Sequence, residues 1–245
     1  MKYLLTISYD GGRYCGFQKQ NNGISIQQVL TECAEKVFGE GCRITGCSRT
    51  DSGVHAVGFK ATLECDITSV PLDKIPVALN CHLPPDISVT DALEVDDSFH
   101  PRYSAREKEY RYVIDNGRYR DPFLNGRAYR YAKPINIDLM NEASKHLIGE
   151  HDFSSYMASG SKITDAIRTI YGIDIIREAQ KVIVCIRGNG FLYNMVRIIV
   201  GTLLLVSEGK LKPSAIKTIP ESKDRTNAGP TVPACGLYLF DVRYL

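Results

Sequence analysis

Residues 48–56 read Ser-Arg-Thr-Asp-Ser-Gly-Val-His-Ala, and strand-like residues lie on both sides of them, around 42–46 and 57–63. The stretch places one carboxylate, that of Asp51, in a tight polar loop, with Arg49 two residues before it and a glycine two residues after it. A carboxylate held on a turn at the entrance to a strand is positioned to serve as a nucleophile. The alternative is an ordinary turn aspartate that caps backbone amides beside the glycine.

Hydrophobic patterning predicts further strands and helices on both sides of this loop. The clearest helix follows Ser25, a suitable N-cap with Gln28 completing a capping box, and it ends at Gly39. Strands are expected near 3–9, 42–46, 57–63, 87–95, 109–115, 168–176, 182–187 and 236–244. Further helices are expected at 71–79, at 137–148, from about 190 to 206 and, as a short element, from Pro213.

Strands, helices and long loops occur in both halves of the chain, which favours two lobes. No linker rich in Pro, Gly or Ser separates them, although a boundary near residue 105 or 145 is compatible with the pattern. We therefore expect lobes 1–105, with the Asp51 loop, and 106–245, joined through one sheet.

The composition is that of an ordinary soluble globular protein: 245 residues, 44% of them hydrophobic and 24% charged. The net charge of +2 excludes a polybasic protein, so an anionic partner must meet a local basic patch. None of the eight cysteines forms a Cys-x-x-Cys pair and the five histidines are scattered, so the sequence predicts no metal site. No secretory leader is visible, which favours reduced thiols in a cytoplasmic protein.

Arg197 lies within an almost wholly apolar run, residues 191–206. The run is shorter than the roughly 20 residues of a membrane-spanning helix, so a buried core helix is expected. An arginine that stays charged in such a helix needs a carboxylate or phosphate partner. Three arrangements satisfy this need. Arg197 can form a structural ion pair, or its side chain can reach the surface. It can also pair with Asp51, which would keep that acid ionised in a dry pocket.

The predicted strand Glu109-Tyr110-Arg111-Tyr112 places its two tyrosines on one face and its arginine on the other. Two tyrosines on one face of a strand commonly pack in a core. Around this strand, residues 100–133 hold nine Lys or Arg, four acids and six tyrosines. Such a mixture suits an RNA surface, and it is equally compatible with a solvated strand-and-loop surface.

Several motifs together resemble the tRNA pseudouridine synthase A family. Arg49-Thr50-Asp51-x-Gly53-Val54-His55 is similar to its Arg-Thr-Asp-x-Gly-Val-His signature, and Met195 to Gly201 is similar to its Met-Val-Arg-x-Ile-Val-Gly motif. Residues 9–20 and 236–239 resemble its opening segment and its terminal strand. Ser48 departs from the pattern, because the family usually has glycine before Arg-Thr-Asp.

The resemblance implies an α+β fold: two similar lobes sharing a mixed, mostly antiparallel sheet, with helices on one face and a central active-site cleft. It implies isomerisation of uridine to pseudouridine at positions 38, 39 and 40 in the anticodon stem-loop of tRNA. It further implies a cytoplasmic homodimer that grips one tRNA, with no metal or organic cofactor and no membrane attachment.

The resemblance also implies residue roles. Asp51 is the nucleophile, Tyr110 stacks on the uracil, Arg197 orients Asp51, and Arg49 fills the space left by the flipped base or holds its phosphate. His55 is assigned no acid or base role. Alternatives are a tRNA-binding or chaperone module without catalysis, a paralogue specialised for another RNA, and a glycosidase. The last needs a second carboxylic acid, which neither motif supplies.

Overall fold

A computed structural model describes residues 1–66, 70–160 and 163–244 of the chain. They form two compact units, Met1–Arg106 with Tyr238–Leu245, and Glu107–Leu237. The expected lobes 1–105 and 106–245 differ from this division at the end of the chain. There the last strand pairs in parallel with a strand of the first unit, through Tyr238 opposite His55 and Leu239 opposite Ala56.

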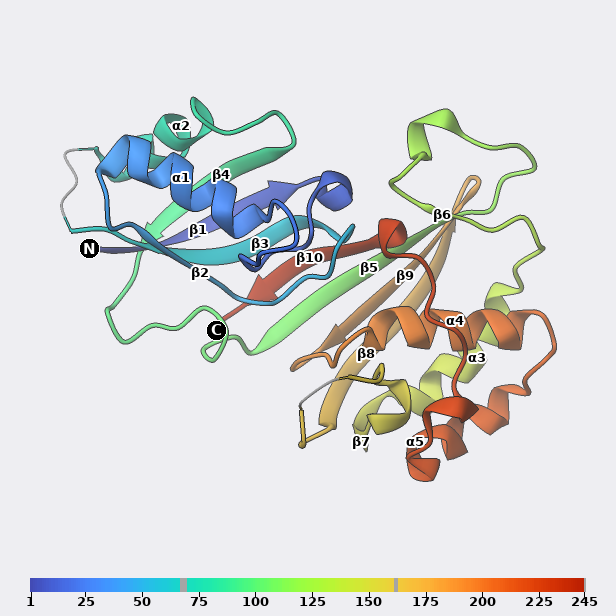
Figure 1. Cartoon of the computed structure of the whole chain (residues 1–245). Helices are drawn as coiled ribbons and strands as arrows, with labels where there is room; N and C mark the ends of the chain where they lie inside the picture. The colour runs from blue at the N-terminus through green and yellow to red at the C-terminus, as the bar shows by residue number, and fades with distance from the viewer. Residues whose placement is uncertain (67–69, 161–162, 245) are drawn as a thin grey trace. The chain divides into compact units, whose positions relative to one another are not determined.

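The first unit is a sheet covered by two helices (Figure 1). Its elements are β1 (Lys2–Tyr9), α1 (Ile26–Phe38), β2 (Arg43–Gly46), β3 (His55–Glu64), α2 (Ile75–Asn80), β4 (Ile87–Glu94) and β10 (Leu237–Arg243). The strand order is β4-β1-β3-β10, and β2 pairs with the other end of β3. All of these pairs are antiparallel except β3–β10. Since α1 packs on β2, α2 on β4 and the helices on each other, they share a face.

The second unit has the same kind of architecture. Its elements are β5 (Glu107–Asp115), β6 (Tyr129–Arg130), α3 (Ile137–Ser144), β7 (Gly149–Asp152), β8 (Ile167–Glu178), β9 (Lys181–Gly188), α4 (Met195–Ser207) and α5 (Thr218–Ser222). The strand order is β5-β9-β8-β7, antiparallel throughout, and β6 pairs in parallel with β5. α3 packs on both α4 and β8, and α4 packs on β5. The expectation of an α+β fold with mixed, mostly antiparallel pairing is confirmed.

Local sequence signals explain α1. The Ser25 hydroxyl accepts a hydrogen bond from the Gln28 amide at 3.2 Å, as expected of an N-cap. The Gln28 side chain donates to Glu32 at 2.9 Å, so it supports the helix through a contact four residues ahead. Ile26, Leu30, Cys33 and Ala34 are buried at helical spacing.

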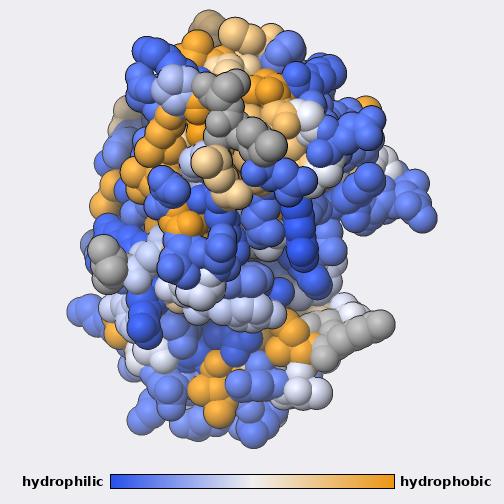
Figure 2. Space-filling view, turned by 90° about the vertical axis from the view of Figure 1, so that its left-hand side faces the viewer, coloured by the Kyte–Doolittle hydropathy of each residue, from blue (hydrophilic) through white to orange (hydrophobic). Residues whose placement is uncertain are grey.

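The structure also describes the cysteines and the apolar helix. The eight cysteines are free thiols. Among the described residues, no helix combines the length and the hydropathy needed to span a bilayer. Figure 2 shows a mostly hydrophilic surface with smaller hydrophobic areas.

Candidate active site

Asp51 lies in the loop that joins β2 to β3 and is only partly exposed. The loop turns sharply after it, because the Val54 amide donates to the Asp51 carbonyl at 3.1 Å. Gly53 makes this turn with φ of +77°, a conformation that side chains disfavour. Asp51 therefore lies on a turn just before β3, as the sequence predicted. The hydrogen bond between Val54 and Asp51 holds the backbone of this turn in place.

The segment that follows β1 holds this loop in place. The Thr50 hydroxyl is hydrogen bonded to the Tyr9 hydroxyl at 2.8 Å, and the Ser52 hydroxyl donates to the Tyr14 carbonyl at 3.2 Å. Gly11 packs so closely that a Cβ there would lie 1.9 Å from the Val54 carbonyl oxygen. The opening segment therefore fixes the position of the Asp51 loop by packing against its backbone.

His55 begins β3 and is 2% exposed. Its Nδ1 lies 3.1 Å from both the Gly11 amide and an Asp10 carboxylate oxygen. Because the amide always carries its hydrogen, Nδ1 is the acceptor of the Gly11 hydrogen bond. The ring also stacks on Tyr238 at 4.7 Å between centroids. His55 thus links the loop to β10.

Tyr110 lies on β5, opposite Ile186 of β9, and its residue is 7% exposed. Its ring meets Phe191 edge to face at 5.1 Å, just before α4. Tyr112 on the same strand is fully buried and donates to the Pro233 carbonyl at 2.7 Å, and burial raises the pKa of its phenol far above the usual value. Burial of 110, 112 and 114 against partial exposure of 111 and 113 follows the predicted alternation.

Arg197 occupies the first turn of α4. Its Nε donates to the Val232 carbonyl at 2.7 Å, and its Nη1 donates to the Asn194 side chain at 2.6 Å. Both of these acceptors are uncharged, and α4 has no acidic residue in its first turn. The guanidinium thus lies at the positive end of the helix dipole, where a cation is disfavoured unless other groups compensate its charge.

Asp51 and Arg49 share one loop of the first unit, while Tyr110 and Arg197 belong to neighbouring elements of the second. The pairing of Asp51 with Arg197 stays a prediction.

A family described as tRNA pseudouridine synthase matches residues 5–104 and 143–245. The chain belongs to the tRNA pseudouridine synthase family. It is 46% identical over 241 residues to tRNA pseudouridine synthase A of Thermoanaerobacter sp. (strain X514), and 47% identical over 241 residues to the protein of that name from Caldicellulosiruptor bescii, with 98% of both chains covered each time. It is 44% identical over 246 residues to that of Bacillus subtilis, covering 100% of this chain and 99% of the relative.

Membership of this family makes the chain an enzyme, a pseudouridine synthase and therefore an isomerase, as the resemblance implied. A solved Cbf5-Nop10-Gar1 complex aligns with TM-score 0.37 and 11% identity, over 82% of this chain and 44% of the other, which is too low to support an inference. In the described parts of this synthase, no cluster of three or more His, Cys, Asp or Glu side chains is arranged to hold a metal ion.

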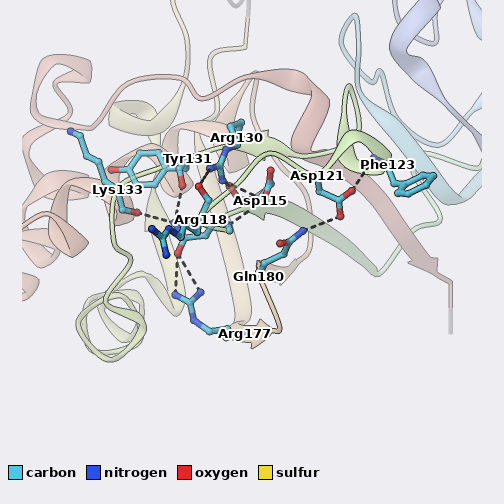
Figure 3. A network of polar contacts seen from close by, with 11 residues as sticks. Asp115, Arg118, Asp121, Phe123, Arg130, Tyr131, Lys133, Arg177 and Gln180 are labelled. Carbon is cyan, nitrogen blue, oxygen red and sulfur yellow. Dashed lines mark hydrogen bonds and ion pairs between the residues drawn. The ribbon is translucent and has the colours of Figure 1, made fainter.

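The basic and aromatic segment 100–133 of this synthase is partly structural. Figure 3 shows Arg130 turned toward Asp115, with 3.4 Å between Nη1 and Oδ1, and Gln180 donating to Asp121 at 2.9 Å. Arg111 is likewise paired with Glu109 at 2.7 Å. Phe123 points away from this network and is 85% exposed. Part of the predicted basic surface is therefore engaged in contacts within the protein.

Sequence reasoning did not single out the turn at His100–Tyr103. Together with Ser48 and Arg49 it lines a cavity of about 210 Å³ in the first unit. The only signal in the sequence was the density of basic and aromatic residues that begins there. Nothing local indicated that this turn lies beside the Asp51 loop, because residues about fifty positions apart had to be brought together.

Proposed function

We propose that this enzyme converts uridine to pseudouridine at positions 38, 39 and 40 of tRNA anticodon stem-loops, with Asp51 as the nucleophile. The observation that carries the proposal is the Asp51 turn, which stands within the family-matched region of a chain 46% identical to a named tRNA pseudouridine synthase A along nearly its whole length. The name of that relative supports tRNA as the substrate. The positions come from the resemblance of the motifs.

The reaction detaches uracil from the ribose and reattaches it through a different atom. The N1–C1′ bond breaks, the base turns while it is held in the site, a C5–C1′ bond forms, C5 loses its proton, and N1 takes up a proton in its place. In one route the Asp51 carboxylate adds to C1′ as N1 leaves, and it is displaced when C5 attacks. In the other, Asp51 removes the C2′ proton and later returns it. Both routes require an ionised carboxylate in a site closed to water.

The target nucleotide must first leave the stem, which costs a few kcal/mol. We assign Arg49, exposed on the catalytic loop, to contact the RNA backbone or occupy the vacated space. We assign Tyr110 to stack on the flipped uracil and accept the C5 proton. Arg197, in the first turn of α4, is assigned to orient Asp51, as the resemblance implies.

The proposal is tested by incubating the enzyme with unmodified tRNA transcripts that carry uridine at 38, 39 or 40 and mapping pseudouridine at single-nucleotide resolution. Product at these positions, without free uracil, is expected. Tight binding without product would instead identify a binding module, and release of uracil would identify a glycosidase. Pseudouridine confined to another RNA in cells that retain the gene, and lost when it is deleted, would identify a specialised paralogue.

We further propose a cytoplasmic homodimer that binds one tRNA across both subunits, as the resemblance implies. Light scattering of the purified enzyme, with and without tRNA, tests this assembly. A mass of two chains is expected, and a monomer both alone and on tRNA would contradict it.

A further inference from the structure

A small cavity lies beside the Asp51 loop, wholly within the first unit. Its volume is about 210 Å³, below the roughly 300–1,000 Å³ of pockets that hold drug-sized ligands. Phe17 and Gly46 contribute to its walls, as do Arg49 of the catalytic loop and the turn His100–Tyr103. A cavity of this size suits one planar base.

The side chains around the cavity have the chemistry of a nucleotide site. Arg49 and Arg102 supply two guanidinium groups, and no Asp or Glu is among the lining residues. Tyr103 is 77% exposed, and its ring centroid lies 4.3 Å from that of the His100 ring and 6.0 Å from the Arg102 guanidinium carbon. Guanidinium groups bind phosphates, and exposed aromatic rings stack on bases that have left a helix. Gln18 adds an amide that can both donate to and accept from a base edge.

The turn that carries Tyr103 is held in shape before any ligand binds. The Nδ1 of His100 accepts hydrogen bonds from the amides of Arg102 and Tyr103, at 3.1 and 3.4 Å. The Tyr244 hydroxyl donates to the Pro101 carbonyl at 3.0 Å and thereby ties the turn to the end of the chain. A preformed site loses less conformational entropy on binding.

The opposite wall is equally fixed. Phe17 stacks on the fully buried Phe59 at 4.2 Å between centroids. The Gln27 side chain donates to the Ile44 carbonyl and accepts from the Lys19 amide, each at 2.8 Å. Both walls therefore belong to the folded unit, and Tyr103 stays largely exposed to solvent beside them.

We propose that this cavity holds one unpaired nucleotide of the RNA substrate next to the target uridine, its base stacked on Tyr103 and its phosphate bound by Arg102 and Arg49. The proposal rests on the proposed function. Arg49 and Asp51 are two residues apart, at most about 7 Å between Cα atoms, which is close to the length of one nucleotide step. The pocket therefore serves the nucleotide adjacent to the one that reacts.

The test measures the affinity of an unmodified tRNA transcript with uridine at 38–40 for wild type and for Tyr103→Ala, Tyr103→Phe and Arg102→Ala. Lys36→Ala, which removes an exposed charge from α1, is the matched control. Tyr103→Ala is expected to raise Kd about 5- to 150-fold, and Tyr103→Phe to restore it to near wild type. Arg102→Ala is expected to reduce the slope of log K against log salt by about 0.7–0.9, whereas Lys36→Ala leaves it unchanged.

Melting temperatures equal to wild type show that an affinity change is not a folding defect. Kd values within twofold of wild type for Tyr103→Ala and Arg102→Ala, with unchanged salt slopes, would overturn the proposal. Loss of subunit association with tRNA affinity intact would also overturn it and assign the cavity to a protein partner. Pseudouridine formation by wild type is scored separately, so failure of the nucleotide site and failure of the proposed function give different results.

Discussion

Gly11 shows how the lack of a side chain sets the position of the Asp51 loop. Its Cα faces the Val54 carbonyl at a distance that leaves no room for a methyl group, while Gly12 next to it has a would-be Cβ 3.1 Å from the Asp10 side chain. The first obstacle is backbone of the catalytic loop, and the second is the end of a side chain that can move. Alanine at position 11 therefore tests the contact with the loop backbone, and alanine at position 12 shows what a glycine-to-alanine change does without that contact.

Gly11→Ala is expected to displace Val54 and with it the turn that follows Asp51. Overpacking of this kind costs about 1–3 kcal/mol of unfolding free energy. Pseudouridine formation should fall by more than the loss of stability alone explains, because the proposed nucleophile, Asp51, moves with the loop. Chemical denaturation and product assays check both effects, with Gly12→Ala as the control. Equal stability and activity of the two variants would show that the loop does not depend on this packing.

At the scale of elements, the sequence predicted those helix ends that are set by capping residues close to them in the chain. Ser25, the apolar spacing after it and Gly39 mark α1, and the structure places the helix at Ile26–Phe38. The segment 71–79 was expected as one helix, but it is a short 3₁₀ turn, Leu72–Lys74, followed by α2. Pro76 explains this break, because proline favours the first turn of a helix and has no amide to continue an earlier one.

The apolar helix α4 was expected from about residue 190 but begins at Met195. Hydropathy does not distinguish a buried loop from a buried helix, so the apolar run from Phe191 predicted a helix that begins several residues too early. Asn194 decides the boundary, because it adopts a left-handed conformation with φ of +59°. The same residue accepts from Arg197, so the start of the helix and the placement of its arginine are one arrangement.

Replacing Asn194 separates its two roles. Asn194→Gly keeps the left-handed conformation and loses the bond to Arg197, whereas Asn194→Ala loses both, so alanine should be less stable than glycine by about 1 kcal/mol. Both should slow product formation, and Asn194→Asp, which retains an acceptor for Arg197, should slow it least. Thermal unfolding and single-turnover rates measure these effects. An alanine variant as stable as the glycine variant would contradict the role of the backbone conformation.

At the scale of the whole molecule, the sequence was weakest where distant residues must meet. The motifs identified the candidate site residues Asp51, Arg49, Tyr110 and Arg197. Their spacing did not predict the hydrogen bond from Arg197 to Val232 or the packing of Gly11 on Val54. The last strand shows the same limit. Its alternation predicted a strand at 236–244, but only pairing with β3 shows that it belongs to the first unit.

The stability of the molecule should depend on pH through Glu208. Hydrogen bonds from Lys133, Lys210 and Tyr131 lower the pKa of this carboxyl from 4.5 to about 2. A carboxyl with a lowered pKa in the folded state stabilises fully above its ordinary pKa and loses this contribution as pH falls toward the lowered value. Glu208→Gln should therefore lower the melting temperature at neutral pH, and its difference from wild type should shrink between pH 4.5 and 2.

Melting curves from pH 7 to 2 measure this difference, with Glu221→Gln on α5 as an exposed control. Other carboxyls with lowered pKa values make both proteins less stable in acid, so the comparison of the two curves is the readout. A constant difference across the whole range would assign the effect of the variant to packing.

The most direct test of the mechanism is the single-turnover rate of Asp51→Asn on saturating unmodified tRNA, measured beside its tRNA affinity. Asparagine keeps the size and turn preference of aspartate and removes the nucleophilic carboxylate. We expect no pseudouridine above background, with Kd within a few-fold of wild type. Product formation within tenfold of the wild-type rate would contradict the assignment of Asp51 as the nucleophile.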